Sequence, residues 1–543
     1  MTEQWSRRRV LAVGSALGAA TAGGVALSGA MANHPATTGN QLRSGVPLPK
    51  PYTVPLPIPP VLKPTSTAGG TDRYEISQHR VSAEILPGVR TTLWTYHGSF
   101  PGPTIEGRRG RPVTIRHRNE LPVPTVVHLH GGHTPAASDG YPTDLVLPKG
   151  WPDPAAEHGD HHGDHHSGGH GGGQDGHQMS DSRAVTSKLT REYTFPHDQR
   201  ATMLWYHDHR MDFTAPAIWR GLAGMHLIRD DIEDALDLPR GERELPLMIA
   251  DRAFAADGSL DYPSLDPDLL SRPGVEGRYA AGVLGDVILV NGAPWPVHEV
   301  DAARYRLRLL NASNARHYEL EALTDDGRLL HLHQIGADQG LLSRPVTHTR
   351  LPLAPAERYD VIVDFANVRP GTRVRLLNRL GSGRTREVMA FRVARRARKD
   401  DGRIPAKLAD DLPAWRRSQA TEVREFAFKS GRMQHGRGWL IGGRAFDPAR
   451  TDVRTRLGTV ELWRLVADVH HPVHLHLVGF KVLSRGRGGP LPHDAGLKDT
   501  ISLRPGESAE ILTRFDGYRG RYLFHCHNAE HEDMGMMANL EIT

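Results

Sequence analysis

Short apolar runs separated by turn residues recur along most of the chain. Examples are segments 111–116, 286–290 and 360–364, which read Arg-Pro-Val-Thr-Ile-Arg, Asp-Val-Ile-Leu-Val and Asp-Val-Ile-Val-Asp. Glycine, proline and asparagine separate such runs, and there is little sustained helical periodicity. This pattern predicts antiparallel β-sandwiches.

Similar strand-like segments stand at similar places in each third of the chain. They cover residues 113–119, 305–311 and 461–466. This weak repetition predicts three β domains. We place them at residues 71–235, 236–396 and 421–543, with a charged linker at 397–420.

The N-terminus reads as a targeting segment. Ser6-Arg-Arg-Arg-Val-Leu precedes an apolar run from Ala12 to Ala30, which ends in the small-residue triplet Ala30-Met-Ala32. This order predicts a twin-arginine signal peptide over residues 1–32, followed by an extended Pro- and Thr-rich segment over 33–70. We therefore expect export to the periplasm, the cell surface or the medium.

Composition is that of an ordinary large protein with a sizeable core. Of 543 residues, 38% are hydrophobic and 24% charged, and 67 basic against 62 acidic residues give a net charge of +5. No basic run interleaved with aromatics occurs, so we expect no nucleic-acid partner. After the N-terminus, no stretch is long and apolar enough to span a membrane.

The chemistry is concentrated near the C-terminus, around the only cysteine of the chain. Cys526 stands between His525 and His527 and is followed by His531 and Met536. Thiolate, imidazole and a weak axial thioether form the ligand set of a blue-copper site. Because side chains alternate along a strand, His525 and His527 should face one way and Cys526 the other. This short segment can therefore contact two metal centres.

Three more histidine motifs have the same period of two. They are His128-Leu-His130, His207-Asp-His209 and His474-Leu-His476. With His525 and His527 they supply eight imidazoles, enough for three copper ions. His471, Cys526 and His531 remain for a separate trigonal site, with Met536 as its axial ligand.

The motifs HLHG, WYHDH, HPVHLH and HCHNAEHEDMGMM, in this order, closely resemble those of the multicopper oxidases. The resemblance extends from about residue 50 to the end. It implies an all-β fold of three cupredoxin-like Greek-key β-sandwich domains. It also implies four copper ions per chain, one of type 1, one of type 2 and a type 3 pair. The cluster of three would lie between domains one and three, with the middle domain as a spacer that carries substrate-pocket loops.

The family pattern assigns each ligand to a copper type. The type 1 set is His471, Cys526, His531 and Met536. The type 2 pair is His128 and His474. The type 3 set is His130, His207, His209, His476, His525 and His527. The resemblance also places two acids, Asp139 and Glu532, beside the cluster, where O2 reduction consumes protons. Contacts from Asp208 are expected to orient the histidines.

Other histidines fit no ligand position. His331 and His333 have the right spacing without the surrounding motif, and His133 and His470 lie outside the pattern. The segment 157–178 holds seven histidines among glycine and aspartate. It is expected to be a mobile insertion, either a plain solvated loop or a weak collector of copper.

The resemblance implies a laccase-like enzyme that couples one-electron oxidation of a donor to reduction of O2 to water. The expected donors are phenols, aminophenols or a bilirubin-like compound. A cuprous oxidase acting on Cu(I) in copper tolerance is the first alternative, because Met534, Met536, Met537 and the histidine-rich insertion leave it open. A non-enzymatic cupredoxin-fold assembly protein is the second. A monomer is expected.

Overall fold

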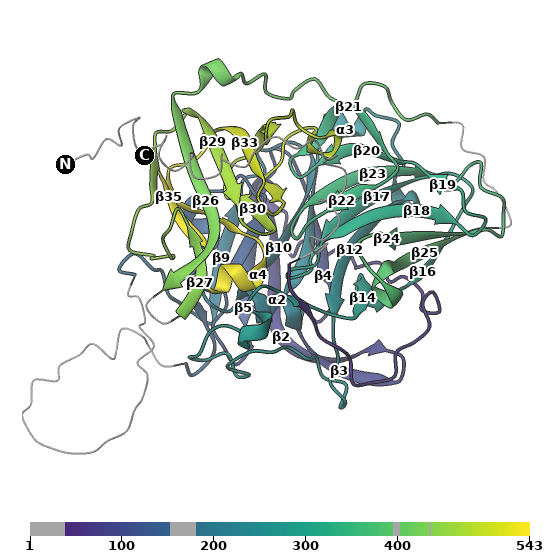
Figure 1. Ribbon diagram of the computed structural model, residues 1–543, viewed down its shortest axis with the longest axis horizontal. Coiled ribbons are helices and arrows are strands. Elements are labelled where there is room, and N and C mark those ends of the chain that lie inside the picture. Colours follow the sequence, from purple (N-terminus) through teal and green to yellow (C-terminus); the bar gives the residue numbers. More distant parts are fainter. Residues whose placement is uncertain (1–37, 152–180, 395–401, 434–435) are drawn as a thin grey trace, which may run out of the picture. The chain divides into compact units, whose positions relative to one another are not determined.

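The computed structural model describes residues 38–151, 181–394, 402–433 and 436–543 (Figure 1). The predicted signal peptide, the histidine-rich insertion and residues 397–401 of the linker lie outside them. All of these described residues belong to one compact unit. Strands dominate, as predicted. The α-helices among the described residues are short: α2 (Thr214–Arg220), α3 (Asp231–Asp234) and α4 (Ala529–Asp533).

Two four-stranded sheets form the first third of the chain. One contains β4 (Gly102–Arg108), β11 (Ala223–Arg229), β10 (Thr202–Asp208) and β6 (Val127–His130). The other contains β3 (Val89–Tyr96), β2 (Asp72–Leu86), β5 (Val113–Asn119) and β9 (Thr190–Phe195). Buried alternate residues of β2, β5 and β9, such as Ile76, Ile115 and Tyr193, fill the core.

The middle third contains two larger sheets. One runs β15 (Ala293–Pro294), β14 (Val287–Val290), β12 (Glu244–Arg252), β17 (Arg304–Asn311), β23 (Arg358–Asp364), β20 (Leu332–Ala337) and β21 (Gly340–His348). The other runs β16 (Val297–Val300), β25 (Glu387–Val393), β24 (Arg373–Asn378), β18 (Tyr318–Thr324) and β19 (Leu329–Leu330), with β22 (Leu351–Leu353) paired to β18. Their facing sides share a second core.

Two five-stranded sheets form the last third. One runs β27 (Gly436–Ile441), β26 (Glu422–Met433), β29 (Val460–Ala467), β33 (Ser508–Arg514) and β31 (Phe480–Arg485). The other runs β28 (Val453–Thr455), β35 (Met537–Ile542), β34 (Gly520–Cys526), β30 (His471–Leu475) and β32 (Thr500–Leu503). Cys526 and Met536 belong to the core between them.

The weak sequence repeat corresponds to a repeat in strand pairing. Its three segments fall on β5, β17 and β29, which pair in parallel with β2, β12 and β26. Each also pairs antiparallel with a later strand, β9, β23 or β33. The predicted β-sandwiches are therefore confirmed, but their sheets are mixed and not antiparallel throughout. The apolar and turn pattern marks strands but carries no information on direction, and longer crossover connections, such as the one between β2 and β5, bring parallel strands together.

Short strands, single β-bridges and 3-10 turns connect the N-terminal segment and the loops to these sheets. In the N-terminal segment, β1 (Asn40–Gln41) pairs with β13 (Val283–Leu284) of the middle third, and Val61 forms a bridge to Thr104 of the first. β7 (Val146–Leu147) pairs with β8 (Ser187–Lys188). The 3-10 turns are Ala68–Gly70, Ala136–Ser138, Gly241–Arg243, Gly277–Tyr279, Gly383–Arg386, Arg417–Gln419 and Pro492–Asp494.

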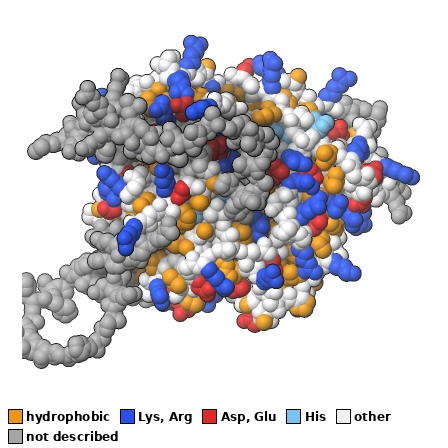
Figure 2. Space-filling view, viewed as in Figure 1, with side chains coloured by type: hydrophobic (Ala, Val, Ile, Leu, Met, Phe, Trp, Pro, Cys, Tyr) orange, Lys and Arg blue, Asp and Glu red, His pale blue; other side chains and the backbone are white. Residues whose placement is uncertain are grey.

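Helices α2 and α4 lie side by side (Figure 1) and join the first third to the last. The carboxylate of Asp533 in α4 accepts hydrogen bonds from the backbone N–H groups of Thr214 and Ala215 at the start of α2. These N–H groups have no partner within their own helix, so the aspartate caps α2 from another domain. On the face drawn in Figure 2, basic and acidic side chains lie interspersed. No helix within the described ranges reaches the length and apolarity that crossing a bilayer requires.

Candidate metal centres

Strand β34 brings Cys526 into a pocket inside the last domain. His471 opens β30, Cys526 ends β34 and His531 lies in α4. The three donor atoms form a nearly equilateral triangle. Cys526 Sγ lies 3.3 Å from His471 Nδ1 and 3.6 Å from His531 Nδ1, and the two nitrogens are 3.2 Å apart. All three residues are fully buried, and the triangle suits a trigonal metal site.

Neighbouring groups fix which ring nitrogen faces the sulfur. His471 Nε2 lies 2.9 Å from Asp468 Oδ1, and His531 Nε2 donates to the carbonyl oxygen of Ala281 at 3.2 Å. Both Nδ1 atoms are thereby left for a metal. Burial lowers the pKa of His531 and of His471, which keeps the rings neutral as ligands must be.

The predicted axial residue Met536 is completely buried beside this triangle. Its backbone N–H donates to the carbonyl oxygen of His531, and its own carbonyl accepts from the N–H of Cys526. A residue that the motifs did not indicate, Trp439 of β27, stacks on His531 with ring centroids 3.6 Å apart. Trp439 lies far from Cys526 in the sequence, which therefore gave no signal for this contact.

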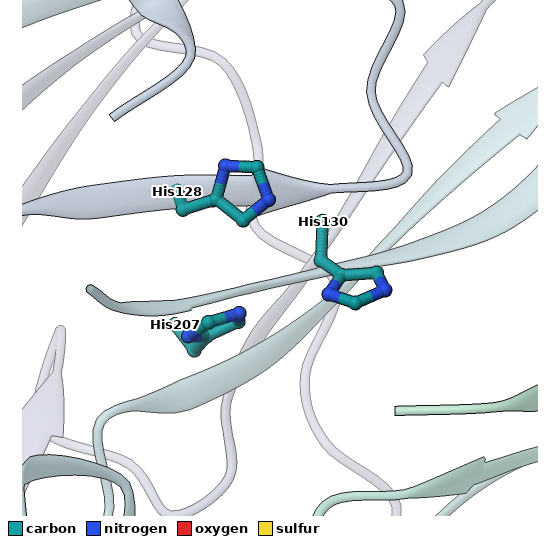
Figure 3. Close-up of side chains that lie close together, drawn as sticks. All are labelled: His128, His130 and His207. Atoms are coloured by element: carbon teal, nitrogen blue, oxygen red, sulfur yellow. The ribbon is translucent and has the colours of Figure 1, made fainter. Parts of the chain in front are cut away.

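The opposite face of β34 looks into a cluster of eight imidazoles. They come from the ends of four strands, β6, β10, β30 and β34, and from the residues directly after them. Each is at most 2 % exposed. The cluster consists of His128, His130, His207, His209, His474, His476, His525 and His527. Figure 3 shows His128, His130 and His207 from the first domain close together.

Two stacked pairs join the first domain to the third within this cluster. His128 stacks on His476 with centroids 4.0 Å apart, and His130 stacks on His474 at 3.6 Å. His525 Nε2 lies 3.1 Å from His476 Nε2 and 3.5 Å from His209 Nε2. The cluster is thus a composite of both domains, as the motif order predicted.

One nitrogen of several rings is held by a hydrogen bond, and the other has no partner among the described residues. His128, His207 and His474 donate through Nδ1 to backbone carbonyl oxygens, and their Nε2 atoms are unpaired. His130 is reversed: its Nε2 lies 3.2 Å from Asp499 Oδ1, and its Nδ1 is unpaired. Buried unpaired nitrogens are costly unless a ligand satisfies them. The cluster therefore fits bound metal ions.

The electrostatics of these rings also suit metal binding. Burial lowers the pKa of His207 to about 3 and that of His209 to about 4, with a further contribution from neighbouring imidazoles. Neutral imidazole is the form that binds a cation. Burial raises the pKa of the Cys526 thiol, so a bound cation is needed to keep it as thiolate.

The two predicted acids both touch the cluster. Asp139 follows a 3-10 turn and accepts a hydrogen bond from His476 Nδ1 at 2.8 Å, while its carbonyl accepts from His128. Burial, helped by Asp144, raises its pKa well above the ordinary value. Glu532 in α4 has one carboxylate oxygen 3.2 Å from His525 Nδ1 and the other 3.6 Å from His209 Nε2. Asp208 orients His207 through its carbonyl oxygen.

A third acid, Asp499, was not indicated by the motifs. It contacts His130 through Oδ1, and its carbonyl oxygen accepts a hydrogen bond from His474 Nδ1 at 2.9 Å. Burial alone would raise its pKa, but the guanidinium of Arg358 holds the pKa well below the ordinary range. Arg358 belongs to the middle domain, which is therefore more than a spacer.

The histidines set aside from the sequence lie away from both centres or beside them without joining them. His333 contacts Thr347 in the middle domain, and His331 is exposed next to it. His470 Nδ1 lies 3.2 Å from the hydroxyl of Thr38. His133 pairs with Asp198 at 2.6 Å.

Family models match the first and last parts of the chain, which carry the histidines and the cysteine of both centres. A family model described as Multicopper oxidase matches residues 414–543, and a second with that description matches 78–151 and 161–233. A laccase from Bacillus stratosphericus is 37% identical over 90% of this chain and 98% of its own. Bilirubin oxidase from Albifimbria verrucaria is 33% identical over 91% of this chain and 81% of its own. The crystal structure of a laccase from Pediococcus acidilactici Pa5930 matches with a TM-score of 0.75 and 30% identity, covering 92% of this chain and 96% of that one.

Proposed function

This chain belongs to the multicopper oxidase family, and we propose that its two centres hold four copper ions, one in the Cys526 pocket and three in the imidazole cluster. The activity is that of a laccase-like, copper-dependent oxidoreductase that uses O2 as acceptor. The observation that carries the proposal is the division of β34. Cys526 contacts His471 and His531 on one face, and His525 contacts His209 and His476 on the other.

Copper, when bound, would supply one-electron transfer from the donor and the reduction of O2 to water. The chain supplies the connection between the two centres. Cys526 is bonded through the backbone to both His525 and His527, so the path between the pockets is short and covalent. The surrounding groups fix the tautomer and orientation of the ligand rings in advance.

Asp139 and Glu532 are proposed to handle protons beside the cluster. Burial favours the protonated form of Asp139, whose Oδ1 has no partner among the described residues. Glu532 lies against His209 and His525 on the other side of the cluster. Asp139 can therefore donate a proton as a general acid. The neighbouring His525 and His209 hold the pKa of Glu532 well below its ordinary value despite its burial, so Glu532 is a carboxylate that can accept and pass on a proton.

We propose small phenols, aminophenols or a bilirubin-like compound as electron donors. The laccase and bilirubin oxidase relatives support this class. Cuprous oxidation is the second candidate, but two of the methionines that favoured it are in the core: Met536 is fully buried and Met537 is 2 % exposed. Neither is available to collect Cu(I) at the surface.

We also propose that the protein is exported by the twin-arginine route and that the mature chain begins after Ala32. The mature chain acts outside the cytoplasm as a monomer. The Arg-Arg motif, apolar run and Ala-Met-Ala triplet support it. Mass spectrometry of protein recovered from the periplasm or medium tests the cleavage site, and light scattering tests the monomer. A cytoplasmic, uncleaved chain would contradict the export proposal.

The copper assignment is tested by metal analysis, visible absorption and EPR on copper-loaded mature protein. We expect about four copper ions per chain, intense blue colour, and separate type 1 and type 2 EPR signals. A His331→Ala, His333→Ala double variant is the control and should keep all of them. A colourless protein would refute the proposal, and so would copper uptake that does not depend on the ligand residues.

A further inference from the structure

A buried ion pair lies where the three domains meet, directly behind the imidazole cluster. Arg358 opens β23 in the middle domain, and Asp499 precedes β32 in the last. The two guanidinium NH2 groups each donate to one carboxylate oxygen, both at 2.6 Å. Each side chain is 1 % exposed. This bidentate arrangement fixes the carboxylate plane as well as its position.

Every donor of Arg358 has a partner. Nε donates to the backbone carbonyl of Met203 at 3.2 Å. Besides their bonds to Asp499, Nη1 donates to the carbonyl of Ala356 at 3.2 Å and Nη2 donates to the carbonyl of Asp338 at 3.0 Å. A guanidinium has five N–H donors, and two point at Asp499, so all five are used. Met203 belongs to β10, the strand that carries His207. One side chain therefore binds all three domains.

The carboxylate held by Arg358 reaches two cluster imidazoles. Oδ1 faces His130 Nε2 at 3.2 Å and His474 Nδ1 at 3.6 Å, and the Asp499 carbonyl accepts from His474 Nδ1. His130 and His474 are the rings that stack across the boundary between domains one and three. Asp338 fixes the backbone there, because its carboxylate accepts from the N–H groups of Asp499 and Thr500.

The glycine of the HLHG motif leaves room for this pair. A Cβ atom on Gly131 would lie 2.4 Å from Arg358 Nη2 and 2.6 Å from Asp499 Oδ2. Its φ of +82° is also in the left-handed region that favours glycine. Gln339 completes the arrangement by donating to both Gly131 O at 3.0 Å and Asp499 Oδ2 at 2.7 Å. The ion pair is thus packed against the backbone next to His130.

We propose that Arg358 is a positioning residue of the imidazole cluster: it holds Asp499 so that this carboxylate orients His130 with Nδ1, and His474 with Nε2, toward the metal. The middle domain thereby controls copper retention in a cluster to which it gives no ligand. This inference rests on the proposed four-copper assignment. Partners that orient metal-bound histidines are typically worth about 10–100-fold in metal affinity or activity.

The test compares Arg358→Gln and Arg358→Lys with the wild type in the copper-loaded mature protein. Arg306→Gln is the matched control, because Arg306 is also a fully buried arginine of the middle domain. It is paired with Asp360 of that domain and Glu233 of the first, and with no histidine of the cluster. Copper is withdrawn with a chelator while the blue absorption and the type 2 EPR signal are followed separately.

In Arg358→Gln we expect cluster copper to be lost at about 10–100-fold lower chelator concentration, with the blue absorption retained. The type 2 EPR parameters should change, kcat should fall, and KM for the donor should stay constant. Arg358→Lys should recover only part of this, because lysine is a point charge without the bidentate fork. Arg306→Gln should lower the unfolding temperature and leave copper retention unchanged.

Equal chelator resistance and identical type 2 EPR in Arg358→Gln and wild type would overturn the inference, and so would parallel loss of blue absorption and cluster copper. If Arg358→Gln does not fold, Asp499→Asn replaces it. The asparagine amide keeps the shape of the aspartate side chain and removes the negative charge that Arg358 and His130 contact. A wild type that takes up no cluster copper would refute the proposed function itself, which distinguishes the two failures.

Discussion

The two faces of β34 differ in how their pockets are built. The Cys526 face opens into a pocket whose proposed ligands all come from the last domain, three of them within eleven residues of sequence. The His525 face opens into a cluster that needs strands of the first and last domains and carboxylates or cations from all three. The first takes all its proposed ligands from one domain and one orienting contact, the Ala281 carbonyl on His531, from the middle domain. The second exists only when the domains are correctly packed.

The two centres therefore depend on different contacts for their stability. The Cys526 pocket depends on the core of one sandwich, in which Cys526 and Met536 are packed. The cluster depends on inter-domain hydrogen bonds such as the one between His476 and Asp139. Changes at the boundary between the first and last domains should therefore affect the cluster before the pocket, and changes in the last core should affect the pocket first.

The largest effect is expected from Cys526→Ser, which removes the sulfur on one face and leaves both imidazoles on the other. Blue absorption should vanish and donor oxidation should fall to the level of copper-free protein, because a hydroxyl does not replace the thiolate ligand. About three copper ions per chain should remain, as measured by metal analysis and type 2 EPR. Loss of all copper would show that the pockets are not separable.

Asp139→Asn should act on the cluster face alone. The amide cannot supply a proton, so kcat should fall by about 10²-fold or more while the blue spectrum is retained. Stopped-flow reoxidation by O2 measures this step directly. Asp251→Asn, another buried aspartate, which is paired with Arg316 outside the cluster, is the control and should lower stability without this loss. Equal reoxidation rates in Asp139→Asn and wild type would rule out the proton role.

Met536→Leu should tune the pocket without removing it. Leucine keeps the buried volume but not the thioether, so the reduction potential of the type 1 centre should rise, because a weak axial ligand tunes it. Blue colour and copper content should be retained, and turnover should change by less than about tenfold. A redox titration gives the answer. An unchanged potential would mean that Met536 is only a core residue.

The smallest effect is expected at the boundary outside both pockets, where His133 and Asp198 of the first domain meet Tyr518 of the last. Burial opposes protonation, but Asp198 raises the pKa of His133, and Asp198 itself has a lowered pKa. The stabilisation is therefore present below the ordinary histidine pKa and lost as pH rises through the raised one. It is also lost in acid as Asp198 becomes protonated.

His133→Gln should thus lower the free energy of unfolding by roughly 0.2–1 kcal/mol near pH 5 and by less near pH 9, since Asp198 is partly exposed and screened. Denaturant titration at both pH values measures it, with His331→Gln as the control. A larger loss at pH 9 than at pH 5 would contradict a stabilising pair between protonated His133 and Asp198.

The sequence alone predicted the features that repeat along the chain or lie within one contiguous segment. Alternation along β34 predicted that Cys526 and His525 diverge, and the four motifs predicted which imidazoles would meet. The strand-like segments 113–119, 305–311 and 461–466 did become equivalent strands. These features depend on local periodicity, which a chain displays directly.

Contacts set by tertiary packing were not accessible in the same way. Arg358 and Asp499 are 141 residues apart, and neither stands in a ligand motif. Trp439 reaches His531 from a separate hairpin. Parallel pairing of β2 with β5 also escaped prediction, because the turn pattern does not encode strand direction. A buried ion pair is specified by two distant surfaces that meet only in the folded protein.

The most direct test of coupling between the two centres is an anaerobic reductive titration followed by exposure to air. A phenolic donor is added until the blue colour is bleached, the electrons taken up are counted, and O2 is then admitted. We expect about four electrons per chain and full return of the blue colour without release of hydrogen peroxide. Uptake of a single electron, with a bleached centre that air does not restore, would show that the two faces of β34 do not work together.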